Sequence, residues 1–178
     1  KLIREAGIQC FEFLDIQANP TVHNVNEAVK AFNECGAESI IALGGGGPMD
    51  VAKATGLIAT HGGTVIDYVG LEKVPGPVVP MVAIPTTAGT GSEVTASSVI
   101  TDSETKFKMT VISRYLIPSY ALLDPDLIMT LPAGIAAACG VDSFIHAMEA
   151  YLSKMGNPFT DAMAEKAMEL IGGNIRQF

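Results

Sequence analysis

The chain has 178 residues, 48% of them hydrophobic and 17% charged, with a formal net charge of −8 at pH 7. This composition is typical of a globular chain with a sizeable core, and the acidic balance excludes nucleic acid as an expected partner, because nucleic-acid binders need clustered Lys and Arg. The apolar runs are short and broken by Gly, Pro or charged residues, so the sequence predicts no membrane-spanning segment.

The three cysteines, Cys10, Cys35 and Cys139, form no CxxC pair and are odd in number. They predict no disulfide framework and favour a cytoplasmic location. The first residues, KLIREAGI, are typical of the end of an amphipathic helix, and the chain stops in or just after another helical pattern. We therefore expect a segment of a longer protein.

Predicted strands and helices alternate over the first two thirds, a pattern typical of an α/β, Rossmann-like fold with a parallel sheet. In chain order, the sequence predicts a short strand over 9–13, a helix over 22–32 that Gly36 ends, a strand over 39–43 buried on both faces, and a helix from Pro48. Residues 64–68 are ambiguous. A surface loop over 71–80 leads into a buried strand over 78–84, and residues 93–113 predict a hairpin that projects from the sheet.

A last strand is predicted over YALLD, residues 120–124. From Pro132 the composition changes to Ala-rich helix, and Gly156, Asn157 and Pro158 precede a second helix that starts near Thr160. We place a domain boundary near residue 131.

The segment LGGGGPMD, residues 43–50, lies between a predicted buried strand and a helix. Glycines let the backbone approach a ligand closely, and the free N–H groups of a helix N-terminus suit a pyrophosphate. Asp50 would cap the helix or contact a ribose hydroxyl. The alternative is a tight strand-to-helix turn, since the pattern is neither GxGxxG nor a P-loop.

The segment PTTAGTGSE, residues 85–93, follows the next buried strand and carries the hydroxyls of Thr86, Thr87 and Thr90. Ligands of open α/β sheets bind at this end of the strands, and short hydroxyl side chains suit a ribose, a phosphate or a carboxamide. An ordinary Ser/Thr-rich loop is the alternative. Together with the glycine segment, it indicates one crevice.

Asp142 and His146 are four residues apart on the predicted helix over 132–153, which places both on the same face. An oxygen and an imidazole nitrogen suit Fe²⁺ or Zn²⁺, but two ligands leave such an ion under-coordinated. Neither His23 nor His61 is a convincing third ligand. The alternatives are an Asp–His pair on the helix surface and a core histidine with its hydrogen bonds satisfied.

Four segments, GGGGPMD, AIPTTAGTGSEVT, LLDPDLIMTLP and GVDSFIHAMEAYLS, resemble in order and spacing the iron-containing (group III) alcohol dehydrogenases, over nearly the whole chain. The resemblance implies a dehydroquinate-synthase-like architecture. Residues 1–131 would be an α/β dinucleotide-binding domain lacking its first strand and helix, and residues 132–178 the beginning of an all-α metal-binding domain. The active site would lie between them.

The resemblance also implies roles for individual residues. Gly45, Gly46 and Asp50 match contacts to the pyrophosphate and ribose of NAD or NADP, and Gly47 stands where many members have Ser, which removes one hydroxyl contact. Further positions implied near the cofactor are the loop threonines and two hairpin residues, Thr86, Thr87, Thr90, Ser97 and Lys108.

Asp142 and His146 match the first two of four ligands to Fe²⁺, with Zn²⁺ as the alternative; the other two, both histidines, lie outside this chain. They would act in catalysis through the metal. The implied reaction is reversible hydride transfer between a small-molecule alcohol and NAD or NADP, giving an aldehyde or ketone, in a homodimer.

Three alternatives remain. They are a zinc-dependent polyol dehydrogenase of the glycerol type, a dehydroquinate-synthase-like lyase and a non-catalytic nucleotide-binding module. We expect the isolated segment to hold metal weakly and to be inactive.

Overall fold

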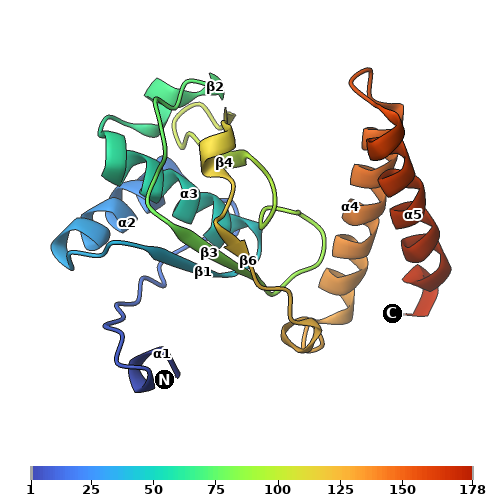
Figure 1. The fold of residues 1–178 in the computed structure, drawn as a ribbon, viewed down its shortest axis with the longest axis horizontal. Helices are drawn as coiled ribbons and strands as arrows, with labels where there is room; N and C mark the ends of the chain where they lie inside the picture. Colours follow the sequence, from blue (N-terminus) through green and yellow to red (C-terminus); the bar gives the residue numbers. More distant parts are fainter. Residues whose placement is uncertain (1, 178) are drawn as a thin grey trace.

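The computed structural model describes residues 2–177; Lys1 and Phe178, the outermost residues of the two predicted domains, lie outside the described residues. Figure 1 shows the arrangement of the elements. In chain order they are α1 (Leu2–Glu5), α2 (Val22–Glu34), β1 (Ile40–Gly44), α3 (Gly46–His61), η1 (Val65–Tyr68), β2 (Gly70–Leu71), β3 (Met81–Pro85), β4 (Ser97–Thr101), β5 (Lys108–Ile112), η2 (Arg114–Leu116), β6 (Tyr120–Ala121), η3 (Pro125–Leu127), α4 (Ala133–Leu152), α5 (Pro158–Asn174) and η4 (Ile175–Gln177), where η marks a 3₁₀-helix.

The first sheet has the order β1-β3-β6, and its neighbouring strands are parallel. Because parallel neighbours need a crossover connection, α3 lies between β1 and β3 in the chain. The predicted α/β fold with a parallel sheet is confirmed. The predicted strand over 120–124 is shorter, since β6 has two residues.

The predicted hairpin forms from β4 and β5, which pair antiparallel. As predicted, the hairpin lies outside the first sheet; it belongs to a second sheet of order β2-β5-β4. Ile100, Met109 and Val111 alternate along its strands and are buried in the core. Burial of this apolar face holds the hairpin against the helices.

Helix α3 is the centre of the α/β unit. Met49 and Ala52 pack with the strands of the first sheet, while Val51 and Leu57 belong to a core shared with α2 and the second sheet. Residues 51–58 are all buried. A helix that is covered on all sides fixes the position of its own N-terminus, where the glycine segment lies.

The first sheet is covered on one face only within the described residues. The side chains of Ile41 and Leu43 on β1 are 45% and 58% exposed, whereas Ala42 between them is buried. The expectation that this strand is buried on both faces was therefore wrong. Both faces of the strand have apolar side chains, but no described helix packs on the face that contains Ile41 and Leu43.

The predicted strand over 9–13 was also wrong, because residues 8–17 form no helix or strand. Phe11 is 62% exposed and Leu14 is 84% exposed. An isolated extended segment gains no ladder hydrogen bonds, and no described strand pairs with this one.

Several predicted boundaries shift by one or two residues. Helix α3 begins at Gly46 rather than Pro48, so Pro48 lies in its first turn. The first turn of a helix tolerates proline, because the backbone N–H groups there have no helical partner. Helix α5 begins at Pro158 rather than near Thr160, because the Asn157 side chain accepts hydrogen bonds from the first turn. The ambiguous residues 64–68 contain the 3₁₀-helix η1.

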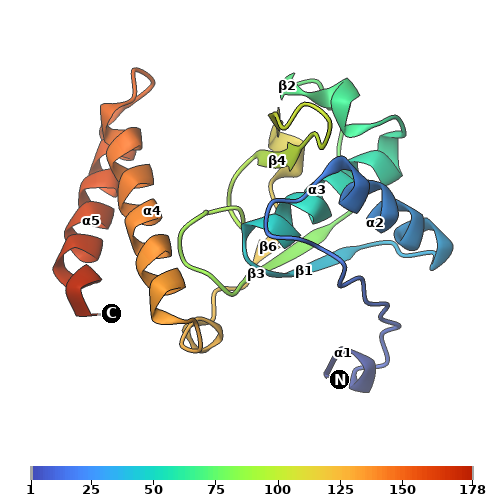
Figure 2. The same cartoon turned by 180° about the vertical axis from the view of Figure 1, so that it is seen from behind.

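The helices α4 and α5 pack against each other and lie to one side of the α/β unit (Figures 1 and 2). Within residues 2–177, no helix is long and apolar enough to cross a membrane. Cys10, Cys35 and Cys139 are free thiols.

Candidate functional site

The carboxyl ends of β1 and β3 lie side by side. Gly44 pairs in register with Pro85, and the backbone N–H of Thr86 donates to the carbonyl of Gly44 at 2.9 Å. The chain leaves both strands at the same edge of the sheet. The glycine turn (residues 44–47) and the threonine loop (residues 86–91) are therefore neighbours, as the sequence predicted.

The glycine turn fits closely against the threonine loop. A Cβ atom added at Gly45 would lie 3.2 Å from Thr87 Oγ1, and one added at Gly46 would lie 2.9 Å from Thr90 Cγ2. Gly44 has φ +149°, which favours glycine. The turn leaves backbone N–H groups at the start of α3, an arrangement that suits an anionic ligand.

Gly47 faces a different part of the chain. A Cβ atom added there would lie 3.3 Å from the carbonyl oxygen of Ala18 and 3.4 Å from that of Gln17. A side chain at this position would thus point towards segment 17–20, away from the threonine loop.

Asp50 lies one turn further along α3, and its carboxylate accepts a hydrogen bond from Ser92 Oγ at 2.9 Å. Ser98 Oγ donates to its backbone carbonyl at 2.8 Å. Burial raises the pKa of the Asp50 carboxyl, while the hydrogen bond from Ser92 opposes that rise. The helix cap is Gly45, so Asp50 does not cap α3.

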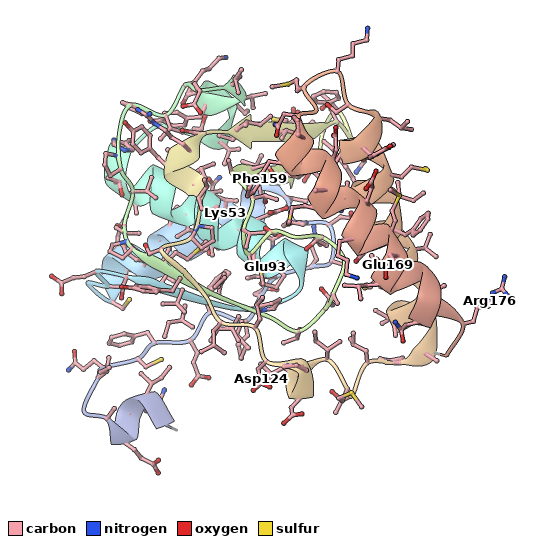
Figure 3. All side chains as sticks on the ribbon, turned by 45° about the vertical axis from the view of Figure 1, so that its right-hand side comes forward. Lys53, Glu93, Asp124, Phe159, Glu169 and Arg176 are labelled. Carbon is pink, nitrogen blue, oxygen red and sulfur yellow. The ribbon has the colours of Figure 1, made fainter. Side chains whose placement is uncertain are left out.

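Lys53 is 2% exposed, and Figure 3 shows it inside the α/β unit, whereas Glu169 and Arg176 lie on the helical part. Its Nζ atom donates to the carbonyl oxygens of Thr95 at 2.8 Å and Ser97 at 2.9 Å. Burial lowers the pKa of Lys53 to about 8, although the charges of Asp50 and Glu93 oppose the shift. Lys53 therefore anchors the segment that enters β4.

The two hairpin residues singled out from the sequence lie apart. Ser97 pairs with Ile112, while Lys108 pairs with Thr101 at the other end of the hairpin. Ser97 is half-buried beside the Lys53 contacts, and Lys108 is exposed. The Lys108 end is close to segment 17–20, because the N–H of Thr101 donates to the carbonyl of Pro20 at 2.8 Å.

Asp142 and His146 lie together on α4, with 3.9 Å between Asp142 Oδ1 and His146 Nε2 and about half of each side chain exposed. His146 Nδ1 lies 3.1 Å from the carbonyl oxygen of Gly89 in the threonine loop. A carbonyl only accepts, so this contact places a proton on Nδ1 and leaves the Nε2 lone pair free in the neutral ring. Nε2 is the nitrogen beside Asp142.

Asp142 and His146 offer two donor atoms to a metal ion. Ligand bonds of about 2.1 Å place two donors of a tetrahedral first-row ion about 3.4 Å apart, so Asp142 Oδ1 and His146 Nε2, at 3.9 Å, lie somewhat further apart than a bound pair. Among residues 2–177, no group of three or more His, Cys, Asp and Glu side chains is placed to hold a metal. His61 instead contacts the carbonyl oxygens of Gly76 and Pro77.

Sequence reasoning missed the polar side chains that join these parts. Ser92 and Lys53 contact residues 42 or more positions away, and Ser143 Oγ contacts the carbonyl oxygen of Ala88 at 3.1 Å. The available signal for Lys53 was its position three residues after Asp50 on a helix that is otherwise apolar at its centre. Ser92 and Ser143 carry no such signal.

Two family models match this chain in order. The family model described as iron-containing alcohol dehydrogenase matches residues 1–125, and the model for the C-terminal part of the Fe-containing alcohol dehydrogenase family matches residues 136–178. An NAD-dependent methanol dehydrogenase of Bacillus methanolicus is 47% identical over 171 residues, covering 96% of this chain and 45% of that protein.

Solved structures are similar over the same region. A 1,3-propanediol oxidoreductase superposes with a TM-score of 0.95 at 43% identity, covering 98% of this chain and 46% of that one. The sulfoacetaldehyde reductase of Bifidobacterium kashiwanohense, solved in complex with NAD⁺, superposes with a TM-score of 0.83 at 35% identity, covering 92% and 44%. This chain thus spans about half the length of these relatives. With both family models matched in order, it belongs to the iron-containing alcohol dehydrogenase family.

Proposed function

We propose that the enzyme containing this chain catalyses reversible, metal-assisted hydride transfer between a small-molecule alcohol and a nicotinamide dinucleotide, giving an aldehyde or ketone. The observation that carries the proposal is the contact between His146 Nδ1 and the carbonyl of Gly89. It joins a pair of metal-ligating side chains to the loop that borders the glycine turn. Family membership supplies the reaction class.

We assign the dinucleotide to the edge of the sheet where β1 and β3 end. Gly45 and Gly46 would face the pyrophosphate and Asp50 a ribose hydroxyl. Ser97 and Lys108 would contact other parts of the dinucleotide. The threonine loop would supply the remaining contacts, through Thr86, Thr87 and Thr90. NAD is favoured over NADP, because the methanol dehydrogenase relative is named NAD-dependent and the sulfoacetaldehyde reductase was solved with NAD⁺.

Asp142 and His146 fit a first-row cation by the chemistry of their donor atoms, and we assign them to Fe²⁺, with Zn²⁺ as the alternative. Such a cation polarises a bound alcohol oxygen and lowers its pKa. The chain's own part is positioning. The hydrogen bond to Gly89 orients the imidazole, and the glycine turn and threonine loop hold the acceptor close to the ligand pair.

The proposed division of labour follows the predicted domains. Residues 1–131 would bind the dinucleotide and residues 132–178 would begin the metal-binding part. The paired helices α4 and α5, standing to one side of the α/β unit, support this division. A homodimer in the cytoplasm stays a prediction of the family resemblance and the cysteine pattern.

Metal analysis of the enzyme purified without air, combined with NAD and NADP reduction across a panel of alcohols, tests the proposal. We expect bound iron and alcohol-dependent reduction of NAD. Bound zinc with a preference for polyols would favour the polyol dehydrogenase instead. Dinucleotide binding without turnover of any alcohol would overturn the proposal in favour of a binding module.

A further inference from the structure

The threonine loop touches two sites at once. One side of it packs on the glycine turn, through Thr87 against Gly45 and Thr90 against Gly46. Residues 88 and 89 of the same loop contact helix α4. Figures 1 and 2 show this light-green loop after β3 extending from the α/β unit towards α4.

The contact with α4 is close and polar. A Cβ atom added at Gly89 would lie 2.9 Å from the carbonyl oxygen of Cys139 and 3.1 Å from its Cα, so the two backbones meet with no room for a side chain. His146 Nδ1 lies 3.1 Å from the carbonyl of Gly89. Helix α4 is thus held on the loop at two points about two turns apart, Cys139 and His146.

Ser143 lies between those two points. Its Oγ is 3.1 Å from the carbonyl oxygen of Ala88 and 3.0 Å from that of Cys139, one turn earlier in α4. Because a hydroxyl has one proton, it is shared between the loop and the helix. Ser143 is adjacent to Asp142 but points its hydroxyl at the loop, so it has no direct role as a ligand in this arrangement.

We propose that Ser143 is a positioning residue that couples dinucleotide binding to metal retention. A dinucleotide held on the glycine turn and the threonine loop restrains the loop carbonyls of Ala88 and Gly89. Those carbonyls in turn hold α4 and fix the direction of the His146 ring. Because the coupling free energy between two ligands is reciprocal, NAD raises the affinity for the metal by the same factor as the metal raises the affinity for NAD. The inference rests on the proposed function, since it requires a metal at Asp142 and His146.

The test measures the rate at which the iron-loaded whole enzyme loses its metal to a chelator, with and without saturating NAD. In the unsubstituted enzyme we expect NAD to slow metal loss. In Ser143→Ala, that protection should fall about fivefold, the effect of losing one hydrogen bond of ordinary strength. Ser153→Ala is the matched control, because Ser153 lies at the end of the same helix and contacts Met155 instead of the loop.

A second pair of variants checks the backbone contact. Gly89→Ala should accelerate metal loss about tenfold or more, since it displaces the carbonyl that orients His146. Gly134→Ala adds the same methyl group to α4 with nothing within 4 Å and should leave the rate unchanged. Thermal unfolding of each variant separates these effects from loss of the fold.

The outcomes separate the two proposals. Equal NAD protection in Ser143→Ala and Ser153→Ala would overturn the coupling while leaving the metal site in place, because mere shielding of the metal by NAD does not depend on Ser143. An unsubstituted enzyme that retains no metal, or whose metal is unaffected by His146→Ala, would overturn the proposed function and the coupling together.

Discussion

The Nζ atom of Lys53 lies 2.8 Å from the carbonyl oxygen of Thr95, and this hydrogen bond ties the central helix α3 to the segment that enters β4. The ammonium group is buried, and burial lowers the pKa of Lys53 to about 8 from an ordinary value of 10.5. The folded protein therefore binds fewer protons at this residue than the unfolded chain between these two pH values. The contribution of Lys53 to stability rises with pH across that window.

Lys53→Met should consequently be more destabilising at high pH than at neutral pH. Between pH 7.5 and 9.5 the difference in unfolding free energy between the two proteins should grow by about 1 to 2 kcal/mol. Urea unfolding of both proteins at the two pH values measures it, and titration of all other groups cancels in the comparison. A difference that stays constant or shrinks as pH rises would contradict a lowered pKa for the buried Lys53.

Ser92→Ala should destabilise the enzyme by about 1 to 3 kcal/mol at neutral pH, because it removes the donor from the partly buried carboxylate of Asp50. The pKa of Asp50 is already raised by burial, and losing Ser92 raises it further. The destabilisation should shrink as pH falls below neutrality and Asp50 takes up a proton. Urea unfolding of Ser92→Ala at pH 7 and pH 4.5 measures this, with the exposed Ser103→Ala as the control; equal stability of the two variants at pH 7 would refute it.

Gly46→Ala should weaken dinucleotide binding about tenfold or more, because the new methyl group would lie 2.9 Å from Thr90 Cγ2 and push the threonine loop away from the turn. The higher helix propensity of alanine should offset part of the cost of this clash to global stability. Calorimetric titration with NAD measures the change. Combining Gly46→Ala with Thr90→Ala should restore part of the affinity.

The matched control for that variant is Gly173→Ala on α5, where an added Cβ has nothing within 4 Å. If Gly46→Ala bound NAD as tightly as Gly173→Ala, the pyrophosphate would not lie on the glycine turn.

Local patterns in the sequence were enough to predict the parts of the candidate site that are continuous in the chain. The strand before Gly44 and the one before Pro85 were predicted from short apolar runs, and parallel pairing then brought their loops together. Helical spacing likewise placed Asp142 beside His146. In each case the residues of one continuous segment are enough to predict the structure.

Contacts between distant segments were not predictable in this way. The Ser92 hydroxyl meets Asp50 across 42 residues, and the His146 ring meets Gly89 across 57 residues, and neither partner is marked by local periodicity. The strand predicted over 9–13 failed for the related reason that a strand depends on its neighbour. Apolar pattern also failed to show that Ile41 is exposed, because burial depends on what packs against the sheet.

We propose that Asp142 and His146 hold the catalytic metal beside the threonine loop. The metal-to-protein ratio of His146→Ala tests this proposal most directly. We predict that the unsubstituted enzyme and His23→Ala, whose imidazole lies on α2, retain about one metal ion per chain, while His146→Ala retains almost none and still binds NAD. Full metal content and undiminished alcohol oxidation in His146→Ala would contradict the account.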